Sequence, residues 1–265
     1  MSGTVTADPS RLAELRAKID AIDESVHRLL MQRASVIDEL IEVKGTAKNG
    51  AAFRPGREAD MMRRLAKRHE GHLPLTAMEH LWREIISTFT ALQAPFEVVI
   101  AGDGDRVASA ETARFYFGFS VPLAVAASSQ AVVAAIEAGG DKLGILPIGA
   151  TGHPWWQGLG SAQIVARLPF FDEPGRPAAT PALVIAPPLA DPVSPEIACF
   201  AVDGLTAMPE VADDLTIIAE APYGTDRFSV LVATEKDAAS VAAAMGPGLD
   251  IRPIGGYAAP CRSLS

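Results

Sequence analysis

The first third of the chain carries one long helical pattern of apolar residues. Apolar side chains recur every three or four positions from Leu12 to Leu40, which places them on one face of a helix. The pattern follows "DPS", where Asp8 or Ser10 can cap a helix, and it continues to about Lys44. A helix of this length is too long to stay inside a compact domain of about 90 residues. It therefore predicts a partner helix, often from another subunit.

Two cations lie within this apolar stripe rather than opposite to it. Arg33 and Lys44 are eleven residues apart in the stripe, which is about 16 Å along the axis because each residue advances a helix by about 1.5 Å. Desolvating a lone Arg or Lys costs several kcal/mol unless an anion pairs with it. A helical Arg can also snorkel or pair with a nearby carboxylate. Two cations on one face favour instead a small dianion bound between them.

Two shorter helices are predicted before residue 94, over residues 57–68 and 77–93. The second of these has Leu81, Ile85, Phe89 and Leu92 at helical spacing. The segments that precede the two helices are rich in Gly, Asn and Pro, and we expect them to be loops. They cover residues 45–56 and 70–76.

After residue 95 the apolar pattern shortens to that of strands alternating with helices. Residues 96–148 predict a βαβαβ unit with a mostly parallel sheet. Further strands are expected at 162–167, 181–187, 196–202, 215–221, 227–234 and 250–255, with a helix at 236–245. The fold class is therefore multidomain: a tail of residues 1–9, an all-α domain of residues 10–95, and an α/β domain of residues 96–265.

The charge distribution supports this division and excludes some functions. Residues 10–93 carry 14 Lys and Arg against 12 Asp and Glu, whereas residues 94–265 carry 9 against 19. The net charge of −9 argues against nucleic acid as the main partner, because a basic face is the usual footprint. The short apolar runs and the polar N-terminus argue against a membrane span or a signal peptide. Two cysteines without a CxxC pair and five scattered histidines indicate a cytoplasmic protein without a metal site.

Three stretches of the helical region share the spacing of their polar residues with a known family. They are "LAELRAKIDAIDESVHRLLMQRASVIDELIEVK", "FRPGREADMMRRL" and "LWREIISTFTALQAP". Together they resemble the all-helical AroQ class of chorismate mutase over residues 11–95, most closely the domain that opens bifunctional chorismate mutase–prephenate dehydratases. The resemblance implies three-helix domains intertwined in a homodimer, chorismate as the substrate, and no cofactor.

The resemblance gives the stripe cations a role in catalysis. Chorismate carries two carboxylates, and its rearrangement to prephenate is a unimolecular pericyclic reaction. An enzyme can accelerate it by holding the compact conformer and by stabilising negative charge on the breaking ether oxygen. The resemblance implies that Arg33 and Arg16 clamp the carboxylates, with Arg16 coming from the partner subunit. Lys44 and Gln93 would donate hydrogen bonds to the ether oxygen.

The resemblance also assigns a role to the start of the second helix. Glu58 would accept a hydrogen bond from the ring hydroxyl of chorismate, and Arg57 would help to shape that corner. Glu58 also fits a helix-start acid that the helix dipole favours. Two positions depart from the best-known family pattern: Arg54 stands where some members have an Asp, and Phe89 stands where some have a small hydroxyl residue.

Residues 95–148 resemble the first lobe of a prephenate dehydratase domain, which has a periplasmic-binding-protein-like α/β fold, but its signatures are altered. Loop residues 101–109 read "AGDGDRVAS" in place of a Gly-Pro-x-Gly-Thr-Phe type sequence. Residues 147–151 read "PIGAT" in place of Pro-x-Glu-Asn, and residues 225–228 read "TDRF" in place of Thr-Arg-Phe. We expect this domain to be degenerate and catalytically silent. Residues 229–258 could equally form a trimmed ACT-like regulatory unit, and an aromatic amino acid is the expected effector.

Two alternative functions remain open at this point. One is a working bifunctional mutase–dehydratase, which would need a proton donor for the leaving hydroxyl. The other is a non-enzymatic ligand sensor or interaction protein in which both sites have decayed. All six family polar positions are retained, which weighs against the second alternative because a decayed site has no reason to keep buried cations.

Overall fold

The computed structural model of the protein describes residues 8–44, 53–149, 153–190, 194–209 and 214–262. The chain divides into two compact units, Met1–Ala47 and Lys48–Ser265. Most of the predicted tail 1–9 and of the predicted loop 45–56 lies outside the described residues.

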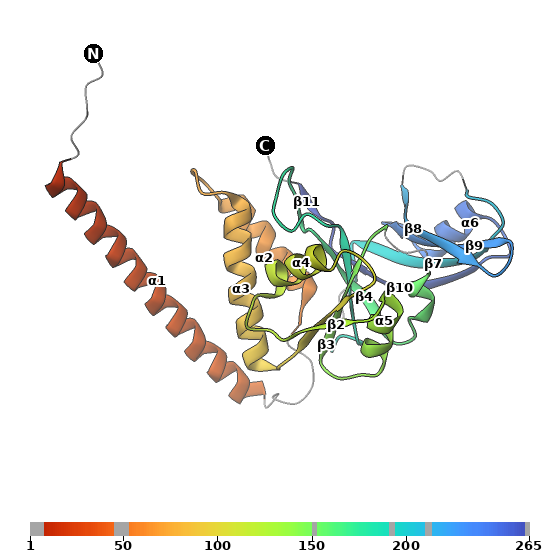
Figure 1. Ribbon diagram of the computed structural model, residues 1–265, viewed down its shortest axis with the longest axis horizontal. Helices are drawn as coiled ribbons and strands as arrows, with labels where there is room; N and C mark the ends of the chain where they lie inside the picture. Colours follow the sequence, from red (N-terminus) through yellow and green to blue (C-terminus); the bar gives the residue numbers. More distant parts are fainter. Residues whose placement is uncertain (1–7, 45–52, 150–152, 191–193, 210–213, 263–265) are drawn as a thin grey trace, which may run out of the picture. The chain divides into compact units, whose positions relative to one another are not determined.

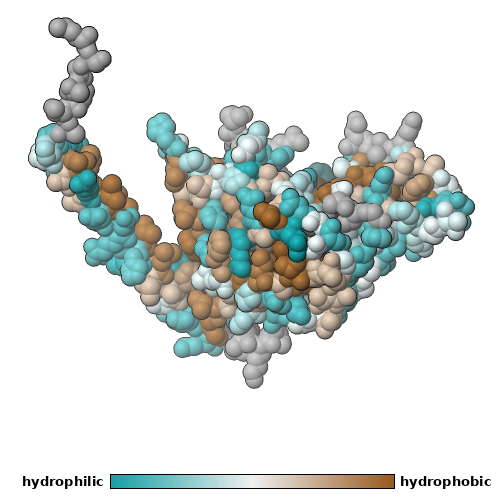
Figure 2. Space-filling view, in the orientation of Figure 1, coloured by the Kyte–Doolittle hydropathy of each residue, from teal (hydrophilic) through white to brown (hydrophobic). Residues whose placement is uncertain are grey.

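The described part of the first unit is the helix α1 (Pro9–Lys44) with the preceding Asp8, which confirms the long helix predicted from the apolar stripe. Asp8 caps it by accepting hydrogen bonds from the backbone N–H and the hydroxyl of Ser10. The apolar stripe is exposed, and Figure 2 shows it as a brown band along the helix. An amphipathic helix gains most of its stability from packing this face. Six stripe residues are between 42% and 61% exposed: Leu12, Leu15, Ile19, Ile22, Val26 and Leu29.

The second unit begins with α2 (Pro55–Arg68) and α3 (Leu75–Gln93), as predicted. Pro55 suits the first turn of α2, where a backbone N–H has no helical partner. α2 buries one face through apolar residues spaced three apart, and these pack against Ile86 of α3 and against Phe170 and Phe171. The buried residues of α2 are Ala59, Met62 and Leu65.

A mixed nine-stranded sheet forms the centre of the second unit, in the order β2-β1-β3-β6-β4-β10-β7-β9-β8 (Figure 1). The predicted strands are all present. Their bounds are β1 (Glu97–Ala101), β2 (Leu123–Ala126), β3 (Lys142–Pro147), β4 (Gln163–Leu168), β6 (Ala182–Ala186), β7 (Ile197–Leu205), β8 (Leu215–Tyr223), β9 (Arg227–Thr234) and β10 (Asp250–Tyr257). Three short elements were not predicted: the 3-10 helix η1 (Trp155–Gly158) and the paired strands β5 (Phe171–Asp172) and β11 (Cys261–Arg262).

The predicted parallel pairing is confirmed within the βαβαβ unit of residues 96–148, whereas the nine-stranded sheet as a whole is mixed. β1 runs parallel to β2 and β3, and β4 and β10 share one parallel register pair. All other neighbouring strands of the nine are antiparallel. A parallel pair needs a long crossover connection, and helices fill that role only after β1 and β2, where α4 (Arg106–Phe117) and α5 (Ser129–Glu137) follow.

α4 and α5 cover opposite faces of the sheet because successive side chains of a strand point to opposite sides. Val98 and Ile100 of β1 pack in one core cluster with the aromatic end of α4. Val99 and Ala101 pack in another cluster with the apolar residues of α5. α4 also contacts α3, so the helices α2 and α3 are joined to the sheet through one continuous packed region.

Strands β10-β7-β9-β8 form an antiparallel group at one end of the sheet, covered by α6 (Ala238–Met245) (Figure 1). Val241 and Met245 of α6 pack on this group in a separate core cluster. Gly255 of β10 has φ +108° and lies directly against the backbone of Ile164 in β4, so a side chain there would collide. This close approach connects the antiparallel group to the rest of the sheet.

Candidate functional site

Three of the six predicted site residues belong to α1. Arg16 is exposed and Arg33 is half-buried. Lys44 is the last residue of the helix, and its side chain lies outside the described part of the chain. One continuous helix therefore carries Arg33 and Lys44, as the stripe predicted.

The other three predicted residues lie at the ends of α2 and α3. Arg57 and Glu58 are in the first turn of α2, where Arg57 is exposed and Glu58 is half-buried. Gln93 ends α3, and its side-chain amide donates a hydrogen bond of 2.9 Å to the carbonyl of Phe89. The structure thus brings Arg57 and Glu58 together, while Gln93 borders neither of the cavities that these two residues line.

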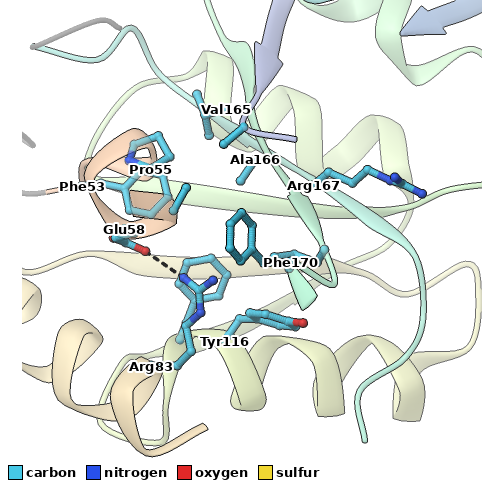
Figure 3. A pocket seen from close by; sticks show the side chains of 13 residues that line it. Phe53, Pro55, Glu58, Arg83, Tyr116, Val165, Ala166, Arg167 and Phe170 are labelled. Carbon is cyan, nitrogen blue, oxygen red and sulfur yellow. Dashed lines mark hydrogen bonds and ion pairs between the residues drawn. The ribbon is translucent and has the colours of Figure 1, made fainter. Parts of the chain in front are cut away.

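Glu58 forms an ion pair with Arg83 of α3 (Figure 3). Arg83 Nη1 lies 3.1 Å from Glu58 Oε2, and the two side chains are 8% and 16% exposed. They border a cavity of about 30 Å³ that Tyr116 and Phe170 also line. This space suits about one water molecule and is far smaller than the roughly 300 Å³ or more of a small-molecule site. The cavity as formed within one chain is therefore too small to enclose a substrate.

Arg83 connects Glu58 to a second, deeper ion pair. Its Nε lies 3.9 Å from Glu79 Oε1, one turn earlier on α3. The other oxygen of Glu79 accepts a hydrogen bond of 2.9 Å from Arg176, and these side chains are 0% and 1% exposed. Sequence reasoning missed Glu79, Arg83 and Arg176. The spacing of Glu79 and Arg83 was the only available signal, because Arg176 is 97 residues from Glu79 in the chain.

Burial and charge act in opposite directions on these carboxylates. Burial raises the pKa of Glu58, and the charge of Arg83 counteracts that rise. Burial likewise raises the pKa of Glu79, against the charges of Arg83 and Arg176. Burial and the nearby Glu79 also raise the pKa of Tyr116 well above its ordinary value. Two carboxylates and two guanidinium groups balance one another, which is what makes burial of all four tolerable.

A larger groove of about 880 Å³ lies between α2 and strands β4 and β10. Arg54, Arg57 and Arg64 border it on the α2 side, and the buried Val165 and Tyr257 line it on the side of the sheet. Arg63 also borders the groove and donates a hydrogen bond of 2.8 Å to Glu196. The volume suits a small molecule.

The stretches that stand in place of the dehydratase signatures have structural roles or are exposed. The carboxylate of Asp103 accepts hydrogen bonds from the backbone N–H and the hydroxyl of Ser129, and Asp105 caps α4. The exposed "TDRF" segment covers the end of the turn after β8 and the first two residues of β9. Pro147 ends β3 and residues 148–149 follow it, whereas 150–151 lie outside the described residues. None of these stretches lines the small cavity or the groove.

Two searches of the described residues gave negative results. No group of three or more His, Cys, Asp or Glu in that part of the chain is arranged to hold a metal ion. Among the helices described, none has both the length and the apolar character needed to cross a membrane.

Comparison with known proteins places the helical region in a family. Residues 15–94 match the family described as chorismate mutase type II. These residues form a type II chorismate mutase domain. Type II chorismate mutases are isomerases, and the mutase domain takes α1 from the first compact unit and α2 and α3 from the second.

The curated relatives are similar to this chain beyond the mutase domain. A bifunctional chorismate mutase/prephenate dehydratase of Stutzerimonas stutzeri is 30% identical over 156 residues, which is 56% of this chain and 42% of the relative. The protein of the same name from Pseudomonas aeruginosa is 29% identical over 156 residues, again 56% of this chain and 42% of the relative. That of Neisseria gonorrhoeae is 37% identical over 87 residues, 33% of this chain and 23% of its own length. The chain therefore spans less than half the length of these relatives. No solved structure gives a significant match.

Proposed function

We propose that this chain catalyses the rearrangement of chorismate to prephenate. The observation that carries the proposal is the family match over residues 15–94, which includes all six predicted polar residues. Arg33 and Arg16 bind the two carboxylates of chorismate, and Lys44 and Gln93 stabilise charge on the ether oxygen. Glu58 accepts a hydrogen bond from the ring hydroxyl, beside Arg57.

These roles require only binding and charge stabilisation from the protein. The reaction forms and breaks bonds within one molecule, so the residues need to select its compact conformer and complement the developing negative charge. The positions of Arg33 and Lys44 on α1 suit a small dianion, because about 16 Å of helix separates them and their long side chains can converge. In this proposal no cofactor takes part.

The active form proposed here is a homodimer built through the mutase helices. The exposed apolar stripe of α1 supports it, since such a stripe is stable only when another helix covers it. α3 has an exposed apolar side as well, with Leu81 at 54% and Leu92 at 62% exposure. In an intertwined dimer a second copy covers these surfaces and supplies Arg16 to the site.

The α/β domain, residues 96–265, is proposed to be a degenerate dehydratase lobe without catalytic activity. The changed signatures and the structural roles of Asp103 and Asp105 support this. In this proposal, β1–β3 with α4 and α5 are what remains of a periplasmic-binding-protein-like lobe. The antiparallel order β10-β7-β9-β8 with α6 supports an ACT-like end for the chain.

A regulatory role for this domain follows from the same proposal. The expected effector is an aromatic amino acid, and the cytoplasm is the expected location. An effector that binds only the folded protein raises its melting temperature. Saturating phenylalanine or tyrosine should therefore raise the Tm of the full chain, and alanine should not.

One assay tests the catalytic proposal. The full chain is incubated with chorismate at neutral pH, and chorismate, prephenate and phenylpyruvate are quantified by chromatography. We expect chorismate to be consumed and prephenate to accumulate. Phenylpyruvate formed faster than from purified prephenate in an enzyme-free control would instead establish the bifunctional mutase–dehydratase. Unchanged chorismate would favour a ligand sensor or interaction protein.

A further inference from the structure

A series of alternating charges connects the α/β domain to Glu58. Arg176 lies after β5, Glu79 and Arg83 lie on α3, and Glu58 lies on α2. Each charge has an opposite charge beside it, at 2.9, 3.9 and 3.1 Å along the series. The first pair is almost completely buried and the last residue is at the edge of a cavity. The series therefore runs from the packed interior to a residue of the proposed active site.

Both arginines are held in place by groups of the α/β domain. Arg83 lies 5.3 Å from the ring centre of Tyr116 and 6.0 Å from that of Phe170. Arg176 lies 5.1 Å from the ring centre of Phe115, and it donates hydrogen bonds to the carbonyls of Phe171 and Pro177. Aromatic faces attract guanidinium groups and restrict their rotation. Neither side chain can turn without breaking several contacts.

Glu58 uses only one of its two oxygens in this arrangement. Its Oε2 accepts the hydrogen bond from Arg83, whereas Oε1 accepts none from the described residues. A carboxylate with one oxygen fixed and the other available is suited to accept a hydrogen bond from a ligand hydroxyl. Its orientation is set before the ligand arrives, which lowers the entropy that binding must overcome.

We infer that Arg83 is a positioning residue for the mutase reaction, and that the Glu79–Arg176 pair fixes Arg83, so that the α/β domain holds the hydroxyl-binding carboxylate of Glu58 in place. This inference rests on the proposed function. It gives a domain without dehydratase chemistry a reason to be retained, since the mutase site depends on it. A purely structural ion cluster would stabilise the fold, and its loss would not move the pH dependence of kcat/KM.

The two possibilities differ in their pH dependence. In its compact unit, the titratable side chains that line the same cavity as Glu58 are Arg83 of α3, Tyr116 of α4 and Arg167 of β4, and Arg167 points away from the ion pair in Figure 3. Glu79 lies beside Arg83, one step further along the series. Arg83 is thus the cation that favours the charged form of Glu58. Without it, burial acts unopposed, and Glu58 becomes protonated at a higher pH. A protonated Glu58 is a poorer acceptor for the substrate hydroxyl.

The test measures kcat and KM of the full chain from pH 5 to 9 for wild type, Arg83→Met and Arg83→Lys. We expect Arg83→Met to lower kcat/KM about 10- to 100-fold, the usual effect of losing a hydrogen bond to a charged group. The acidic limb of its pH profile should move to higher pH, and Arg83→Lys should recover part of both changes. Arg68→Met is the matched control, because Arg68 of α2 stacks on Trp82 of α3 and does not contact Glu58. It should behave as wild type.

A second variant tests the far end of the series. Glu79→Met with Arg176→Met replaces the buried pair by apolar side chains, a change that buried ion pairs often tolerate. With its fold verified by near-UV circular dichroism, this double variant should show lower kcat/KM and the same direction of pH shift, with a smaller magnitude than in Arg83→Met. Wild-type kcat/KM in both variants would overturn the inference. Loss of activity with no displacement of the acidic limb of the pH profile would show that these residues only stabilise the fold. That result would also overturn the inference.

A measurement without substrate separates this inference from the proposed function. The carboxyl ¹³C signal of Glu58, assigned with a Glu58→Gln variant, is titrated in wild type and in Arg83→Met. We expect Glu58 to titrate at higher pH in the variant, whether or not chorismate is converted. Wild-type protein that leaves chorismate unchanged would refute the proposed function, and the titration would still decide whether Arg83 controls Glu58. An identical titration in the two proteins would overturn the inference.

Discussion

Arg176 and Glu79 form a hydrogen-bonded ion pair of 2.9 Å between the segment after β5 and helix α3, with both side chains almost completely buried. The pair joins a mutase helix to the α/β domain within one compact unit. Breaking such a pair from one side leaves a buried charge without its partner, whereas replacing both members removes the charges together.

Arg176→Met alone should therefore destabilise the protein much more than Glu79→Met with Arg176→Met. We expect the single variant to lose about 3–5 kcal/mol of unfolding free energy and the double variant to lose far less. Urea denaturation followed by circular dichroism measures both values. Equal losses in the two variants would contradict the pairing seen in the structure.

Arg33→Ala and Lys44→Ala should each reduce kcat/KM for chorismate by about 100-fold or more, because removal of a group that stabilises developing negative charge typically has this effect. Arg28→Ala is the control, since Arg28 is an exposed arginine of the same helix outside the apolar stripe. Steady-state assays with purified prephenate as the standard give the three values. Activity close to wild type in Arg33→Ala would show that the stripe cation is not part of the site.

Leu29→Asp should weaken the proposed dimer, because it places a charge in the exposed apolar stripe of α1. Met31→Asp is a closely matched control: Met31 is 55% exposed and Leu29 61%, but Met31 lies on the opposite side of the helix. Sedimentation velocity should detect a smaller species for Leu29→Asp and the wild-type species for Met31→Asp. If both variants kept the mass of the wild type, the stripe of α1 would not be the dimer contact.

Glu137→Gln should reveal a pH-dependent contribution to stability. Burial tends to raise the pKa of Glu137, but the backbone N–H groups of Ala162, Gly160 and Ser161 outweigh it, and the pKa is lowered. A lowered pKa stabilises the folded protein at pH values above 4.5, the ordinary pKa of a glutamate. This stabilisation is lost as the pH falls through the pKa of Glu137 in the folded state.

At pH 7 we therefore expect Glu137→Gln to reduce the unfolding free energy by about 1–3 kcal/mol, the usual cost of leaving such donors poorly satisfied. The difference from wild type should shrink as the pH is lowered below 4.5. Glu235→Gln on the exposed surface is the control and should have little effect at either pH. A difference that stays constant down to pH 3 would show that ionisation of Glu137 contributes nothing.

The local elements of the fold were predictable from the sequence because period and capping depend on nearby residues. The stripe from Leu12 to Leu40 predicted α1, and the alternation after residue 95 predicted each of the nine strands of the sheet. The direction of strand pairing was not predictable from the same pattern. It depends on which strands meet in space: β3 and β6 are antiparallel neighbours although β4 and β5 lie between them in the chain.

For the site, the sequence by itself determined which residue types are present and which helix carries them: Arg33 and Lys44 on α1, Glu58 in the first turn of α2. Tertiary structure decided what surrounds Glu58. Arg83 of α3 binds Glu58 of α2. Arg176 completes the series by binding Glu79, which is 97 residues away in the chain. No local pattern encodes such a contact, because burial of a charge becomes tolerable only when folding brings an opposite charge to it.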